Sequence, residues 1–179
     1  FLPITFGPTW VGEPLVLIDS RGWNAQATDG FTILKAELEQ HGLVVKTSAE
    51  VEGTPSPPLS DSVLSRALLV ITDRRESYSP EETDAIDRYV WTGGSLLVST
   101  DSDVSPNFIT AANSLLSRFE ASVSPEGDIG ASTYLAQHLI NTGISSVVND
   151  DGPINISCRW GIPLVQVGNA VVALVTDQG

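Results

Sequence analysis

The sequence has few of the residues on which several classes of protein depend. It contains one cysteine, Cys158, no methionine and only two lysines, Lys35 and Lys46. A single cysteine excludes an internal disulfide framework, a cysteine-rich zinc site and a CxxC redox motif. The longest apolar runs, such as 67–71 and 170–175, are far shorter than the roughly 18 residues that a membrane-spanning helix needs. We therefore expect no direct membrane insertion in this segment.

Positive charge is also scarce. Nine Lys and Arg residues oppose 22 Asp and Glu residues, so the formal net charge is −13. A surface this acidic repels the phosphates of nucleic acids and of anionic lipids. The charge therefore excludes nucleic acid as a partner. A protein partner, or a small polar ligand such as a sugar, is the remaining expectation.

The chain is long enough for one domain with a hydrophobic core. Its 179 residues are 41% apolar, which predicts a single α/β domain over residues 1–179. Because methionine is missing even at position 1, we expect the chain to be processed or excised from something longer. Its localisation stays open on this basis.

Short apolar runs alternate with helical patterns along the first two thirds of the chain. We expect strands at 14–19, 43–46, 67–72 and 95–100, a helix with Leu34 and Leu38 on its apolar face, a short helix at 61–66 and a helix from 106 to 119. The segment 50–60 is expected to be an irregular loop. The runs 162–167 and 170–176, joined by Gly168 and Asn169, predict an antiparallel hairpin. The pattern indicates an open, mainly parallel sheet with helices on both faces and the hairpin at one edge.

The clearest local signal lies at 79–82. Ser79 fits an N-cap, Pro80 the first helical position and Glu82 the third, which together form a capping box. Gly93 and Gly94 are expected to end this helix. They precede a strand instead of following one, so they form no phosphate-binding loop, and we predict no cofactor.

Acidic residues follow four of the predicted strands. They are Asp19, Asp73, Asp101 and Asp177. Ligands of open parallel sheets bind at the carboxyl ends of the strands, and hard cations take carboxylate oxygens, so Asp19, Asp73 and Asp101 are candidate metal ligands. The alternative is that each aspartate forms a turn through its own backbone hydrogen bonds. Both alternatives stay open.

A wider set of candidate ligand-binding residues lies on the same loops. Trp23 and Asn24 suit contact with a sugar or a peptide, although Trp23 can also plug the end of the sheet. The complete set is Asp19, Ser20, Trp23, Asn24, Asp73, Asp101 and Ser102.

No residue fits an activated nucleophile. Ser102 follows a strand, but Asp101 and Asp103 flank it, and their negative charge opposes an alkoxide. Cys158 lies outside any turn from a strand to a helix. We therefore predict no catalytic residue and incline against an enzyme.

Several ordered blocks resemble a known family. These are Leu15–Asp19, Ser79–Glu82, the block YVWTGGSLLV at 89–98, the helix NSLLSRF at 113–119, the run HLINTGI at 138–144 and the closing strand at 168–177. Together they resemble the class I glutamine amidotransferase-like domain, of GIFT or DUF4350 type, of the intraflagellar transport, gliding-motility and 48-kDa oligosaccharyltransferase subunit families. Leu139 replaces the usual proline, and Asn169 and Ala170 depart from the glycine spacing.

The resemblance implies a flavodoxin-like sheet that has lost amidotransferase catalysis, and it transfers no catalytic residue. It favours a non-catalytic ligand- or protein-binding domain of a larger membrane-associated or envelope assembly, in an extracytoplasmic or membrane-associated location. Two alternatives remain. One is a carboxylate-based, metal-dependent enzyme acting on a sugar or phosphate ester. The other is a purely structural scaffold module. A crevice filled by the chain's own side chains would favour this second alternative.

Overall fold

A computed structural model describes residues 14–22, 31–100, 106–124, 130–131, 134–135, 148–149, 155–159, 161–167 and 170–175. The chain divides into two compact units. The first comprises residues 1–73, 79–98 and 179, and the second comprises residues 74–78 and 99–178. Each unit has its own sheet structure. The expectation of one domain over 1–179 stays a prediction.

The first unit contains a four-stranded parallel sheet. Its strands are β1 (Leu15–Ile18), β2 (Val44–Thr47), β3 (Leu69–Thr72) and β4 (Ser95–Val98). Their spatial order is β2-β1-β3-β4, and Ile18 pairs with both Thr47 and Ile71. This is the order of the first four strands in a flavodoxin-like sheet. The predicted mainly parallel α/β architecture is therefore confirmed.

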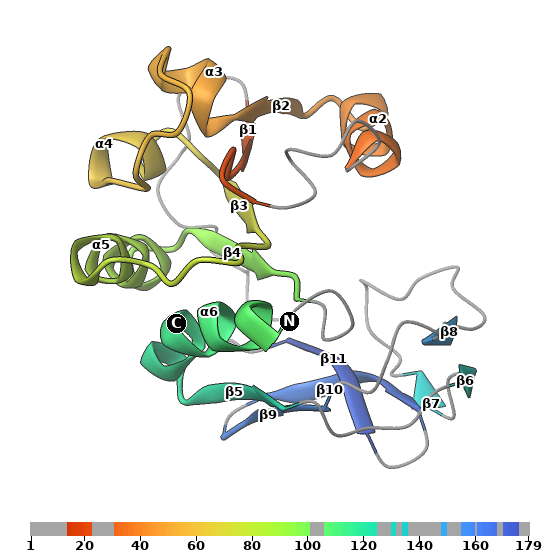
Figure 1. Cartoon of the computed structure of the whole chain (residues 1–179). Helices are drawn as coiled ribbons and strands as arrows, with labels where there is room; N and C mark the ends of the chain where they lie inside the picture. The colour runs from red at the N-terminus through yellow and green to blue at the C-terminus, as the bar shows by residue number, and fades with distance from the viewer. Residues whose placement is uncertain are drawn as a thin grey trace, which may run out of the picture. The chain divides into compact units, whose positions relative to one another are not determined.

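Helices lie on both faces of this sheet (Figure 1). They are α2 (Thr32–Gln40), α3 (Ser48–Glu52), α4 (Asp61–Leu64) and α5 (Pro80–Trp91). Leu34 and Leu38 of α2 pack against Val16, Ile18 and Ile71 on one face. Because side chains alternate along a strand, the buried residues Leu17 and Val70 face the other side, where Figure 1 shows α4 and α5.

The helix beginnings follow local hydrogen-bonding signals. The predicted capping box of α5 is confirmed, because Ser79 Oγ accepts the Glu82 N–H at 3.2 Å and Glu82 Oε2 accepts the Ser79 N–H at 3.1 Å. A second box at Thr47 and Glu50 starts α3. The prediction of an irregular loop from residue 50 is therefore wrong at its beginning, where α3 extends to residue 52.

The second unit packs α6 (Pro106–Leu116) and the 3₁₀ turn η1 (Ser117–Phe119) beside the antiparallel pair β5 (Ala121–Ser124) and β9 (Asn155–Cys158). Leu115 and Phe119 are buried, as the amphipathic pattern predicts. Asn113 binds the backbone of β5 with both ends of its amide. Its Nδ2 donates to the Val123 carbonyl at 2.8 Å, and its Oδ1 accepts the Val123 N–H at 2.7 Å.

The predicted C-terminal hairpin is confirmed as β10 (Ile162–Val167) and β11 (Ala170–Val175). Among the residues that the structure describes, the hairpin does not join the edge of the parallel sheet, contrary to the expectation from the sequence. Within the described residues, β10 pairs instead with β7 (Tyr134–Leu135) in a separate three-stranded sheet. Two further short strands, β6 (Gly130–Ala131) and β8 (Val148–Asn149), pair with each other. The turn residues Gly168 and Asn169 lie outside the described residues.

None of the helices in the part of the chain that the structure describes is long and apolar enough to cross a bilayer.

Candidate functional site

The carboxyl ends of β1 and β3 form the switch point of the parallel sheet, where flavodoxin-like folds place their ligands. The two strands run in register, and the Asp19 N–H donates to the Ile71 carbonyl at 2.9 Å. Asp19 and Asp73 follow these strands directly, and both are buried. The sequence therefore places these two aspartates correctly at neighbouring strand ends.

Both carboxylate oxygens of Asp19 contact Arg21. Oδ1 accepts the Arg21 backbone N–H and its Nε, each at 3.1 Å, and Oδ2 accepts Nη2 at 3.3 Å. The backbone contact is the turn-forming hydrogen bond expected of an aspartate after a strand. The guanidinium contact adds a bidentate ion pair, so Arg21 stands where a cation would bind to this carboxylate.

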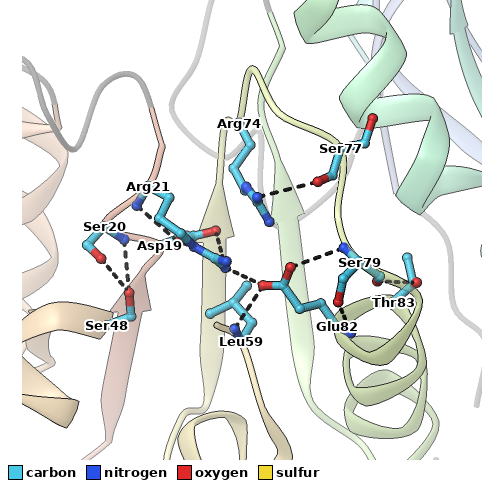
Figure 2. Close-up of polar contacts among 10 residues, drawn as sticks. All are labelled: Asp19, Ser20, Arg21, Ser48, Leu59, Arg74, Ser77, Ser79, Glu82 and Thr83. Atoms are coloured by element: carbon cyan, nitrogen blue, oxygen red, sulfur yellow. Dashed lines mark hydrogen bonds and ion pairs between the residues drawn. The ribbon is translucent and has the colours of Figure 1, made fainter. Parts of the chain in front are cut away.

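Glu82 extends the network from α5. Its Oε1 lies 2.5 Å from Arg21 Nη2 and also accepts the Leu59 N–H at 3.1 Å, while Oε2 accepts the Ser79 N–H. Figure 2 shows Glu82 pointing toward Arg21 and Leu59. Burial alone raises the pKa of Glu82, but the hydrogen bonds from Arg21, Ser79 and Leu59 together outweigh burial and lower it. Glu82 is therefore an anion at neutral pH, with donors on both oxygens.

Arg21 stays charged between these two acids. Burial opposes its positive charge, but the attraction of Asp19 and the hydrogen bonds to Glu82 and Asp19 raise its pKa above the ordinary value. Its side chain is only 16% exposed. The triad of Asp19, Arg21 and Glu82, called the strand-end triad below, is therefore a buried ion cluster in which one guanidinium contacts two carboxylates.

Gly22 allows the loop after β1 to approach β3. A Cβ atom built on Gly22 would collide with Oδ1 of Asp73, and it would lie 3.1 Å from the Asp19 carbonyl oxygen. No side chain larger than hydrogen fits here without displacing Asp73. The close approach holds the buried Asp73 carboxyl group against the loop backbone.

Ser20, a predicted ligand-binding residue, contacts α3. Its N–H donates to Ser48 Oγ at 3.0 Å, and the two hydroxyl oxygens lie 2.8 Å apart (Figure 2). Ser48 is buried at the first position of α3. The Ser20 hydroxyl thus joins the loop after β1 to the start of α3.

The remaining predicted site residues are not placed by the structure. They are Trp23, Asn24, Asp101 and Ser102, together with Asp177, and all lie outside the described residues. The structure therefore does not test whether they join Asp19 and Asp73. Among the described residues, no group of three or more His, Cys, Asp or Glu side chains is arranged to hold a metal ion.

Sequence reasoning missed two members of the strand-end triad. It did not single out Arg21, and it recognised Glu82 only as the third residue of a capping box. The box itself was the available signal, because it fixes the position of Glu82 at the start of α5. The second role of Glu82 is to accept hydrogen bonds from the Arg21 guanidinium. This role depends on how the loop after β1 and the start of α5, which are distant in the sequence, come together in the fold.

The fold and this strand-end site define the class of protein: an α/β domain with a flavodoxin-like parallel sheet. The family model described as a domain of unknown function, DUF4350, matches residues 24–139, and the chain belongs to that family. No curated protein matches the sequence.

Two solved structures share the fold. The first is titled mmIFT52 N-terminal domain, with a TM-score of 0.63 and 14% identity over 87% of this chain and 74% of that one. The second is a protein described as ThuA-like from Bacteroides uniformis ATCC 8492, with a TM-score of 0.51 and 13% identity over 95% of this chain and 77% of that one. At these identities the likeness concerns the fold alone.

Proposed function

We propose that this chain is a non-catalytic protein-binding domain of a larger, membrane-associated or envelope assembly. The observation that carries the proposal is the strand-end triad. At the switch point, where a ligand of this fold would bind, Arg21 already joins the carboxylates of Asp19 and Glu82. A side chain of the protein itself supplies the cation that either acid would otherwise attract.

Several hydrogen-bonding groups around the triad are engaged in the same way. Ser20 contacts Ser48, and Glu82 accepts two backbone N–H groups besides Arg21. A small polar ligand would have to compete with all of these contacts. A scaffold module fits this arrangement better than a small-molecule site, and the family resemblance drawn from the sequence points the same way.

The metal-dependent enzyme is the alternative that this arrangement disfavours. A divalent cation binding at Asp19 and Asp73 would raise the melting temperature by mass action. We expect millimolar Mg²⁺, Mn²⁺ or Ca²⁺ to leave the melting temperature unchanged at low salt. A rise that disappears in Asp19→Asn would support the enzyme and count against the proposal.

The direct test is to isolate the full-length protein from its native cells after reversible cross-linking, and to assay hydrolase and transferase turnover in parallel. We expect one protein in fixed stoichiometry with the chain, and no turnover. Turnover that is lost in Ser102→Ala or Asp101→Asn overturns the proposal. A monomer without any protein partner after cross-linking also overturns it.

A further inference from the structure

The outer face of α5 carries an aromatic side chain that the fold leaves in solvent. Trp91, the last residue of the helix, is 60% exposed, although tryptophan is usually among the well-buried residues. It aligns with Asp84, Asp87 and Arg88, because helix positions three, four and seven apart share one face. Glu82, Thr83, Ala85, Ile86 and Tyr89 are the buried residues of the opposite face. We call Asp84, Asp87, Arg88 and Trp91, with Asp61 of α4, the α5 outer face.

Trp91 is held in one orientation by its own helix. Its Nε1–H donates to Asp87 Oδ1 at 3.1 Å, one turn earlier. The polar atom of the indole is therefore satisfied within the domain, and the surface left in water is the apolar ring. A side chain that is already fixed loses little conformational entropy when a partner covers it.

The charges around the ring are also fixed, and they are mainly negative. Arg88 donates from Nε to Asp61 Oδ1 at 3.2 Å and from Nη2 to Asp61 Oδ2 at 2.7 Å, which links α5 to α4. The hydrogen bonds that Arg88 donates to Asp61 raise its pKa most, and the charges of Asp84 and Asp87 raise it further. The α5 outer face itself thus contributes three carboxylates and one guanidinium.

We propose that the α5 outer face docks a basic segment of a partner protein, with Trp91 inserted against an apolar side chain of that segment. This inference rests on the proposed function, because it names the surface through which the domain would bind its partner. Tryptophan and arginine are the residues that most often dominate binding energy at protein interfaces. The carboxylates around Trp91 favour a partner segment that carries Lys or Arg beside its apolar residue. Complementary charge favours encounter of the two proteins, and like charge opposes it. Sugar hydroxyls also donate hydrogen bonds to carboxylates, so a neutral oligosaccharide is included in the test as the competing occupant.

The first test follows the indole N–H signals of the four tryptophans by NMR, with Trp91 assigned from Trp91→Phe. The probes are two synthetic peptides of equal length with identical leucine positions, one carrying lysine and the other glutamate at every charged position. We expect the lysine peptide alone to shift the Trp91 signal, and less so at high salt. Trp91→Ala should weaken its binding by about tenfold or more. The matched control is Ile33→Ala on α2, which removes a side chain that is 81% exposed and should leave binding unchanged.

Other outcomes of this experiment overturn the proposal. These are equal shifts with both peptides, equal losses in Trp91→Ala and Ile33→Ala, or no shift of the Trp91 signal. A shift that grows with protein concentration alone assigns the surface to a second copy of the chain. A shift produced by a neutral oligosaccharide, but not by the lysine peptide, assigns it to a sugar.

The second test separates this inference from the proposed function. A photo-reactive benzophenone residue replaces Trp91 in the full-length protein in its native cells, with the same residue at Ile33 as the control. We expect an adduct specific to position 91 on a Lys- or Arg-rich segment of another protein, identified by mass spectrometry. If the native complex forms but position 91 yields no such adduct, the docking surface is wrong and the proposed function stands. If no partner complex forms, the proposed function itself fails.

Discussion

Nη2 of Arg21 lies 2.5 Å from Oε1 of Glu82, and the same guanidinium is bound in a bidentate manner to Asp19. The contact joins the loop after β1 to the first turn of α5. The contact therefore connects the end of β1 to α5, which covers one face of the sheet. Loss of the contact would affect both elements.

Replacing Arg21 with Met should strongly destabilise the fold. The substitution keeps much of the side-chain volume but removes the guanidinium that joins the buried carboxylates of Asp19 and Glu82. Breaking a buried pair by removing one partner costs about 3 to 5 kcal/mol in the free energy of unfolding. Urea denaturation followed by circular dichroism measures this loss.

The matched control is Arg88→Met. Arg88 makes a bidentate pair with Asp61 of similar geometry, but both side chains are more than half exposed. An exposed pair contributes about 0 to 1 kcal/mol. Equal losses of unfolding free energy in Arg21→Met and Arg88→Met would show that the buried strand-end triad stabilises the fold no more than an exposed ion pair does.

Glu82→Gln should lower stability at neutral pH and make it less sensitive to acid. Glutamine keeps the size of the side chain but loses the charge that binds Arg21, which costs about 2 to 4 kcal/mol. The pKa of Glu82 is lowered in the folded protein, so its contribution is present above the unfolded value of about 4.3 and is lost as pH falls through the folded value.

The difference between wild type and Glu82→Gln should therefore be largest near neutral pH and shrink below about pH 4. Urea titrations across this range measure it. A difference that is constant with pH would mean that the charge of Glu82 does not stabilise the fold.

Gly22→Ala should destabilise the first unit by about 1 to 3 kcal/mol through a steric clash. The added methyl group would collide with Oδ1 of Asp73. In a double-mutant cycle, Asp73→Ala should recover part of this loss, because it removes the colliding atom.

Gly53→Ala provides the control for this cycle. Gly53 has a φ of +71° and nothing within 4 Å of an added Cβ, so its cost comes from the left-handed backbone alone, about 1 kcal/mol. Its loss should be the same in the wild-type protein and in the Asp73→Ala variant. Additive losses for Gly22→Ala and Asp73→Ala would show that the clash is relieved in some other way.

Tyr89→Phe should reduce stability by about 1 to 2 kcal/mol at neutral pH. The buried phenol hydroxyl lies 3.3 Å from the Ala67 carbonyl oxygen and 3.2 Å from that of Ser95, so it bridges the beginnings of β3 and β4. Phenylalanine leaves both carbonyl groups without this donor.

The same substitution should protect against alkali. Burial raises the pKa of Tyr89 in the folded state. The unfolded chain therefore loses its proton first, and the contribution of Tyr89 declines as pH rises above about 10. Thermal melts from neutral to alkaline pH should show the gap between wild type and Tyr89→Phe narrowing. A gap that widens would mean that the phenol ionises readily in the folded protein.

The sequence allowed the helices and strands of the first unit to be predicted because their signals are local. The capping box at Ser79 and Glu82 and the short apolar runs of the four strands each lie within a few residues. Helix α3 was missed although Thr47 and Glu50 carry the same kind of box. The prolines at 55, 57 and 58 favour a loop, and this signal led to the prediction of a loop from residue 50, where the structure has the end of α3.

The contacts of the candidate site could be predicted only in part. Register in a parallel sheet brings Asp19 and Asp73 to neighbouring strand ends, and that much follows from the order of elements. The pairing of Arg21 with Glu82 depends on how the loop after β1 meets the start of α5, which no periodicity encodes. The hairpin was predicted as a motif, but its pairing with β7 is a long-range choice of partner strand.

The amide of Asn113 has a consequence for how the chain avoids aggregation. A strand that exposes unpaired backbone groups invites strands of other molecules, and proteins commonly place lysines along such edges to repel them. With two lysines in the chain, Lys35 and Lys46, that means is scarcely available. By binding both backbone groups of Val123 on the side away from β9, Asn113 imitates a neighbouring strand one residue long. A neutral side chain thereby occupies, at this position, the backbone groups that a strand of another molecule would need for pairing.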